Sequence, residues 1–239
     1  MRRFLFWSLC FCLLFPVGLS SCDGSDSAAV IFGGTTGKLT WTLTEDGVLT
    51  ITGEGPMPDY RDGGTSETPP WYPHVNRISS LTIGEGVTRI GDYAFMLCSF
   101  VTKVVIPESV TSMGDWAFSE CTGLQEAYIG DGVTEIAAKA FAECTALKTV
   151  VIGKSIQRIG DQAFNTRSSW DQMTLEKITV LFDDIASGSF PVLESGSRGV
   201  FPKPGGWDLV SYKIYVPKGT KAEYQKNWSD YSSLIVEMQ

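Results

Sequence analysis

The chain has 239 residues, of which 43% are hydrophobic and 12% aromatic, and its formal net charge is −8. This composition suits a packed body of one or two domains. With a single histidine and no cluster of lysine or arginine, the sequence argues against a nucleic-acid partner, a histidine-based catalytic triad and a metal site with several histidines.

Residues 1–21 predict a signal for export. Two arginines precede the apolar segment Phe4–Leu19, which is short for a permanent membrane span. The following Leu-Ser-Ser-Cys sequence, which ends at Cys22, resembles a bacterial lipobox. The resemblance implies cleavage before Cys22 and attachment of diacylglycerol to its sulfur, which together with further acylation would anchor the chain in a membrane. An ordinary secretory signal followed by a chance cysteine is the alternative.

Residues 22–37 are small and polar without a pattern, so we expect a flexible tether there. Residues 38–77 predict a β-hairpin cap and a connection. Leu39–Leu43 and Val48–Thr52 alternate apolar residues with threonine around a turn signal, and the apolar side should cover the end of a solenoid. The aromatic residues of the connection pack over this cap or, alternatively, stack on a sugar.

Four abutting copies of one pattern, each 23 residues long, follow the connection: Ile78–Phe100, Val101–Gly123, Leu124–Ala146 and Leu147–Ser169. Each copy offers an alternating strand ended by glycine or proline, a second apolar pair, and an Ala-Phe pair in a segment suited to a turn of helix. A fixed period of this length indicates a solenoid, whose coils stack to bury their apolar faces. The phenylalanines should then form one buried column, which comprises Phe95, Phe118, Phe141 and Phe164.

After Ser169 the register breaks. Leu175–Val180 restores the strand of a fifth coil, and Ser189-Phe190 is a candidate echo of the Ala-Phe pair. We expect Val192–Trp207 to be an irregular loop that ends the repeats, which span 78–207. A terminal coil and cap would occupy 208–239, with a strand at Lys213–Val216, a helix at Thr220–Trp228 with Thr220 as its N-cap, and a last short strand at Leu234–Val236.

The repeat V-x-I-P-x-x-V-T-x-I-G-x-x-A-F-x-x-C resembles the BspA-like leucine-rich repeats of bacterial surface proteins. The resemblance covers Leu39 to about Met238, although Arg167 replaces the cysteine in the fourth copy. It implies a short right-handed solenoid used for binding. The predicted fold is therefore an α/β repeat solenoid, a leucine-rich-repeat-like coil of parallel strands with an N-terminal β-hairpin cap and a C-terminal helical cap.

Residues that could carry chemistry recur with the repeat, which favours structural roles. Cys98, Cys121 and Cys144 lie one repeat apart without a CxxC motif, so we expect reduced thiols in the core and no metal site. Acids such as Asp92 and Asp115 share one place, where turn formation is more typical than glycoside hydrolysis. We expect His74 to be a loop residue, and we predict no catalytic residue, no cofactor and no enzymatic activity.

The fifth place of the strand points away from the core and is our candidate binding surface, formed by Thr82, Val105, Tyr128, Val151, Thr179 and Tyr215. An apolar line flanked by mixed charge is typical of a protein contact, although these residue types also simply suit strands. A second candidate is the sixteenth place, where Tyr93 and Trp116 either hold a glycan or pack on neighbouring coils.

The leading hypothesis is a surface lipoprotein that serves as an adhesion or protein-binding module. Its partner would be a protein of a host or neighbouring cell, and the resemblance implies extracellular-matrix or host glycoprotein ligands. The lipid would hold it in the bacterial cell envelope, on an outer membrane and facing outside. The alternatives are a glycan-binding lipoprotein of a nutrient-uptake system and a purely structural or subunit-interaction role.

Overall fold

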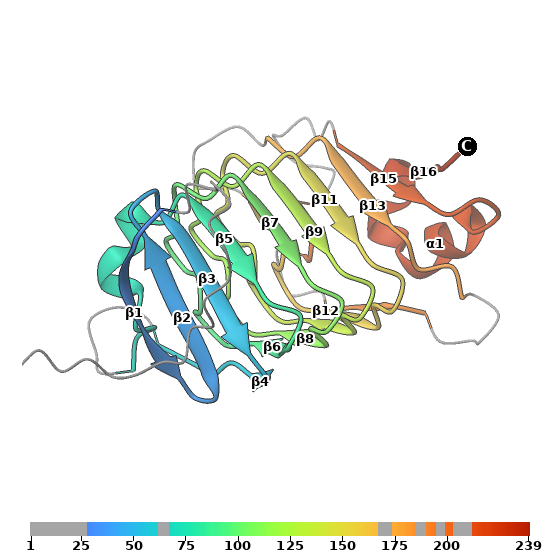
Figure 1. Ribbon diagram of the computed structural model, residues 1–239. Helices are drawn as coiled ribbons and strands as arrows, with labels where there is room; N and C mark the ends of the chain where they lie inside the picture. Colours follow the sequence, from blue (N-terminus) through green and yellow to red (C-terminus); the bar gives the residue numbers. More distant parts are fainter. Residues whose placement is uncertain (1–27, 62–66, 167–173, 185–189, 195–198, 203–211) are drawn as a thin grey trace, which may run out of the picture.

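The computed structural model describes residues 28–61, 67–166, 174–184, 190–194, 199–202 and 212–239. The predicted signal at 1–21, the lipidation site Cys22, Arg167 and Ser189 lie outside these ranges. The coils stack side by side into an elongated body, with a hairpin at one end and the helix α1 at the other (Figure 1). Within the described ranges, no helix has the length and apolar character needed to cross a bilayer.

A meander of three antiparallel strands begins the described chain: β1 (Val30–Thr36), β2 (Leu39–Thr44) and β3 (Val48–Gly53). Strand β3 then pairs in parallel with β5 (Ser80–Ile83) of the first coil. The two strands of the expected hairpin therefore form as predicted. Strand β1 was not predicted: residues 22–37 were expected to be a flexible tether, and Val30–Thr36 of that segment form this strand. Its Phe32 ring stacks on His74 with 3.7 Å between ring centroids, which gives this segment a packing partner.

The main sheet is built from the strands predicted for the coils after the first, together with the last strand of the chain; the strand of the first coil, β5, belongs to the sheet of the meander. It runs in the order β16-β15-β13-β11-β9-β7, and its strands pair in parallel. Their bounds are β7 Lys103–Ile106, β9 Glu126–Ile129, β11 Thr149–Ile152, β13 Lys177–Val180, β15 Lys213–Val216 and β16 Ile235–Glu237. Residues at the same place of neighbouring repeats are register partners, as Val104, Ala127 and Val150 show. The predicted parallel stacking of strands is confirmed.

A second parallel sheet lies along the stack, and the sequence reading missed it. Its order is β14-β12-β10-β8-β6-β4. The bounds are β4 Gly55–Pro56, β6 Val87–Ile90, β8 Ser112–Met113, β10 Glu135–Ile136, β12 Arg158–Ile159 and β14 Val192–Leu193. Most of these strands contain two residues, too few for an alternating pattern, so β6, β8, β10 and β12 were apparent only as the second apolar pair of each repeat. Strand β14 also falls in the segment that we expected to be an irregular loop.

The Ala-Phe segments are turns and not the expected turns of helix. Alternate backbone N–H groups bond to the next coil, and the groups between them bond to carbonyls three residues back in their own coil, so the four-residue bonds of an α-helix do not form. Phe95 N donates to Ala117 O at 2.8 Å, and Phe118 N donates to Ala140 O at 2.7 Å. Seven side-chain-bearing residues in these turns have positive φ, between 55° and 66°: Tyr93, Leu97, Trp116, Glu120, Lys139, Glu143 and Gln162. The described coils therefore contain strands and turns, which corrects the α/β class for the repeats.

The helices of the described residues lie outside the four exact repeats: η1 (Tyr72–Arg77), α1 (Lys221–Asn227) and η3 (Ser229–Leu234). Helix α1 starts after Thr220 as expected. The Thr220 hydroxyl donates to Pro217 O at 2.7 Å and makes no capping bond to the helix. Tyr224 and Trp228 share a buried face, where their polar atoms donate to the carbonyls of Phe182 and Pro191 at 2.8 and 3.0 Å.

The predicted phenylalanine column forms and extends further than expected. Centroid distances along Phe95, Phe118, Phe141 and Phe164 are 5.1, 5.2 and 5.2 Å, and all four rings are buried. Trp71 from the connection continues the column at one end, at 5.5 Å from Phe95.

The column ends at Phe201, 5.4 Å from Phe164, and not at Phe190 of the candidate Ser189-Phe190 pair. The backbone explains the difference. Phe141 N donates to Ala163 O, the residue before Phe164, and Phe164 N donates in the same way to Val200 O, the residue before Phe201, at 2.9 Å. Phe190 instead packs edge-on against Tyr224 at 4.7 Å.

The three repeated cysteines are free and buried, as predicted. Cys121 Sγ donates to Phe95 O and Cys144 Sγ to Phe118 O, each at 3.1 Å, so the thiols tie their coil to the preceding phenylalanine. Burial raises the pKa of Cys98 well above its usual value. Burial does the same for Cys121, aided by the neighbouring thiol of Cys144.

Replacement of Phe118 by alanine should open the middle of the column and lower the free energy of unfolding by about 3–5 kcal/mol, since a buried ring is lost and a cavity remains. Urea titration measures the change. Phe100→Ala is the matched control, because that ring is 58% exposed and its loss should change the free energy by no more than about 0.5 kcal/mol. Equal losses of unfolding free energy in the two variants would contradict the claim that the phenylalanine column stabilises the fold.

The native thiols of Cys98 and Cys121 should react with iodoacetamide about a thousandfold more slowly than in the urea-unfolded chain, because reaction requires opening of the core. Their folded pKa values lie above the unfolded ones, so the unfolded state loses protons first as pH rises. Stability should therefore fall above about pH 8.5. Site-resolved mass spectrometry and unfolding at two pH values measure both effects; fast labelling of the folded chain would refute the buried assignment.

Candidate functional site: the outward face of the main sheet

The main sheet brings five of the six predicted binding residues into one file. Val105, Tyr128, Val151, Thr179 and Tyr215 are successive register partners on strands β7 to β15. Thr82 belongs to β5, where its register partner is Thr50 of the hairpin. Strand β5 lies next to β7 in the stack (Figure 1), so threonines continue the outward surface toward the hairpin.

The members of this file differ in accessibility. Val105 is 55% exposed and Thr82 is also exposed, whereas Tyr128, Val151 and Tyr215 are half-buried. Thr179 has only 8% of its surface exposed, so its side chain is not available as an independent contact. It lies in register between Val151 and the larger Tyr215, which shield a short side chain.

The file has one further member that the sequence reading missed. Val236 of β16 is the register partner of Tyr215 and is half-buried. The predicted last strand at Leu234–Val236 was the available signal, because a strand paired with β15 places alternate residues on the same face. We use the name "outward file" for Val105, Tyr128, Val151, Thr179, Tyr215 and Val236.

Charged side chains flank the outward file two residues before its members on the same strands. Lys103 Nζ lies 3.4 Å from a carboxylate oxygen of Glu126 and 4.5 Å from the ring centroid of Tyr128. The Tyr128 hydroxyl donates to Glu126 at 3.2 Å. Lys177 Nζ lies 5.0 Å from the ring centroid of Tyr215. Each tyrosine therefore carries a lysine at a cation–π distance, which orients the polar rim of the face.

The second candidate surface, at the sixteenth place of the repeat, is a stack. The rings of Tyr93 and Trp116 are nearly parallel, with 6.1 Å between centroids and 7° between planes. Lys139 Nζ lies 4.2 Å from the Trp116 ring centroid. The two aromatic side chains thus pack on neighbouring coils, which is one of the two roles weighed from the sequence.

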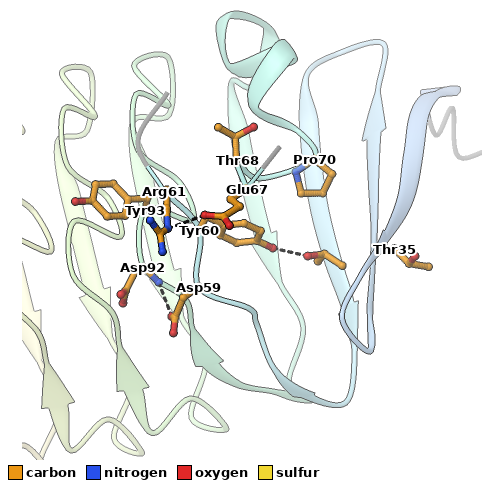
Figure 2. A pocket seen from close by; sticks show the side chains of 10 residues that line it. Thr35, Asp59, Tyr60, Arg61, Glu67, Thr68, Pro70, Asp92 and Tyr93 are labelled. Carbon is orange, nitrogen blue, oxygen red and sulfur yellow. Dashed lines mark hydrogen bonds and ion pairs between the residues drawn. The ribbon is translucent and has the colours of Figure 1, made fainter. Parts of the chain in front are cut away.

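Tyr93 also lines an open cavity of about 1000 Å³ between the end of β1, the connection and the first coil (Figure 2). Asp59, Arg61 and Asp92 line the same cavity. Arg61 Nε lies 2.6 Å from a carboxylate oxygen of Glu67. The cavity combines an aromatic ring, a cation and carboxylates, which are groups that can hydrogen-bond and stack on a polar ring-shaped ligand.

The aspartates of this cavity also order the backbone. Asp59 Oδ1 accepts from Asp92 N at 3.0 Å, and Asp92 Oδ1 accepts from Asp115 N at 3.0 Å. Burial pushes the pKa of Asp59 upward, but bonds from Asp92 and Arg89 outweigh it and leave the pKa lowered. Burial raises the pKa of Asp92 despite the bond from Asp115. The recurring acids therefore join coils, as turn-forming residues do.

Comparison with known proteins places these coils in a family. The family model described as "BspA type Leucine rich repeat region" matches residues 72–190 in 6 copies. These residues belong to the BspA-type leucine-rich repeats. The match covers the strands that carry Val105, Tyr128 and Val151, so the candidate surface is part of the BspA-type region itself.

Solved structures share the architecture. A leucine-rich repeat protein from Eubacterium ventriosum is 26% identical, with a TM-score of 0.55, over 79% of this chain and 44% of that one. The pneumococcal vaccine antigen PcpA is 15% identical, with a TM-score of 0.53, over 83% of this chain and 46% of that one, a likeness of fold alone. The chain spans less than half the length of both proteins. No curated protein matches the chain.

The titratable side chains of the described ranges bear on whether this part of the chain could hold a metal ion. Within those ranges, no group of three or more His, Cys, Asp or Glu side chains is placed to hold a metal ion. His74 lies in η1 against Phe32, and burial together with the charge of Arg77 lowers its pKa. The His74 ring therefore packs within the connection.

Proposed function

We propose that the chain is a cell-surface lipoprotein that binds a protein partner through the outward file of its BspA-type repeats. The observation that carries the proposal is the outward apolar line of Val105, which is exposed, and Tyr128 and Val151, which are half-buried, with charged side chains along its rim. A contiguous apolar strip with a polar rim is the usual anatomy of a protein interface. Leucine-rich repeats typically act as binding modules, and we propose that this chain binds without catalysing a reaction.

The proposal includes the place of the protein in the cell. Lipid on Cys22 would anchor the chain in the bacterial cell envelope, on an outer membrane and facing outside. The β1–β3 meander and the segment with α1 would close the two ends of a right-handed solenoid, as terminal repeats must. The partner would be a surface protein of a host or neighbouring cell, which an anchored, elongated sheet could reach.

A glycan-binding lipoprotein of a nutrient-uptake system is the second candidate. One observation favours it: Tyr93 lines the cavity together with Asp59 and Arg61, and its ring continues into the Trp116 stack. Saccharides are commonly held by an aromatic platform and a few polar groups in a concave site. The two candidates depend on different surfaces and can therefore be separated by mutation.

Tyr128→Ser combined with Val151→Ser should weaken binding to an immobilised panel of extracellular-matrix proteins by at least about tenfold, because truncation of a central interface aromatic is costly. Surface plasmon resonance on the purified chain measures the affinity. Gln157→Ser is the matched control, since it alters an exposed polar residue beside the second sheet. Equal unfolding midpoints would show that the variants remain folded.

Trp116→Ala decides between the two candidates. It should leave binding to matrix proteins unchanged and should abolish a signal on a glycan array only if the second candidate is correct. A chain that binds glycans, loses them on this replacement and binds no matrix protein would contradict the leading proposal.

A further inference from the structure

The outward face contains the same four-residue arrangement twice, with one difference in charge. In the first copy, Lys103 is the register partner of Glu126, and Val105 is the partner of Tyr128. In the second copy, Lys177 is the partner of Lys213, and Thr179 is the partner of Tyr215. Each lysine at the first position lies over the tyrosine two residues along the neighbouring strand, at 4.5 and 5.0 Å from the ring centroid.

The first arrangement is neutralised within the chain. Its Glu126 carboxylate lies 3.4 Å from Lys103 Nζ and accepts a hydrogen bond from the Tyr128 hydroxyl at 3.2 Å. This internal carboxylate shows what a site between a lysine and a tyrosine of this sheet accepts: a negatively charged oxygen held by an ammonium group and a phenol.

The second arrangement has Lys213 where the first has Glu126. Two exposed lysines are thus direct partners on neighbouring parallel strands. Within the described ranges, neither ammonium group lies in an ion pair, and Lys177 has only the Tyr215 ring. Like charges opposite one another destabilise a sheet, and this pair stands on a chain whose formal net charge is −8. A carboxylate supplied from outside would relieve the repulsion in the way that Glu126 does in the first arrangement.

We propose that Lys177, Lys213 and Tyr215 form a carboxylate-binding site for an acidic segment of the partner protein. The proposal rests on the proposed function, because it names the chemistry that the outward file recognises at its C-terminal end. Val151 and Val236 flank the site along the file, so the complementary segment carries acidic side chains beside apolar ones. Charge complementarity selects this occupant: exposed lysines attract acidic segments and repel basic ones.

The test mixes the full chain with a short, fluorescently labelled synthetic peptide of alternating glutamate and valine. Fluorescence anisotropy of the peptide measures binding at low and high salt. We expect saturable binding that weakens as salt screens the charges. Lys213→Glu copies the first arrangement into the second and should weaken binding by about tenfold. Lys148→Glu is the matched control, since it changes the net charge equally at a lysine already 4.0 Å from Glu176.

Glu126→Lys supplies the reciprocal test, because it converts the first arrangement into a copy of the second. It should add a second equivalent of bound peptide. The proposal is overturned if the unaltered chain does not bind the peptide, or if Lys148→Glu and Lys213→Glu weaken binding equally. It is also overturned if polygalacturonate, a glycan that carries carboxylates, binds while the peptide does not. Loss of matrix binding in Tyr128→Ser with Val151→Ser, alongside no effect of Lys213→Glu, would refute this site and leave the proposed function standing.

Discussion

Backbone pairing between residues one repeat apart is the constraint on which the rest of the structure depends. Each coil forms hydrogen bonds with its neighbours along the main sheet, the second sheet and the Ala-Phe turns. The turns hold bulky residues such as Trp116 at a φ of 57°, a conformation that costs about 1 kcal/mol or more for a residue with a side chain. The inter-coil bonds and the stacked phenylalanine rings offset that cost, so the strain is tolerated only while the register is kept.

The same register determines which side chains lie next to one another inside the solenoid and on its outward face. It aligns buried rings into a column on the inside, and it aligns Val105, Tyr128 and Val151 on the outside. It also sets lysine against glutamate in one place and lysine against lysine in another. A difference of one residue between repeats, such as Glu126 against Lys213, therefore becomes a local difference in charge at a fixed position on the face.

The interior of the coils could be predicted from the sequence because the pattern repeats. Elements outside the exact repeats could be predicted less well. The column from Phe95 to Phe164 followed from matching places in four copies, and the buried cysteines followed from matching places in three. Phe201 was missed because the register breaks after Ser169, and the two-residue strands of the second sheet were missed because they are too short to alternate. Strand β1 contains adjacent glycines and offered little strand pattern. Thr179 was placed on the correct file, but its burial depends on larger neighbours that spacing alone does not reveal.

Deletion of one complete repeat, Leu124–Ala146, tests most directly whether coils in register define this fold. The shortened chain would place Phe164 next to Phe118 and join the strands on either side without a change of register. The account predicts a cooperative urea unfolding transition and a retained β-sheet circular dichroism spectrum. Deletion of Leu124–Ile136, which shifts the register by a part of a repeat, should abolish that transition. A chain that unfolds when the whole repeat is removed, and survives the partial deletion, would contradict the account.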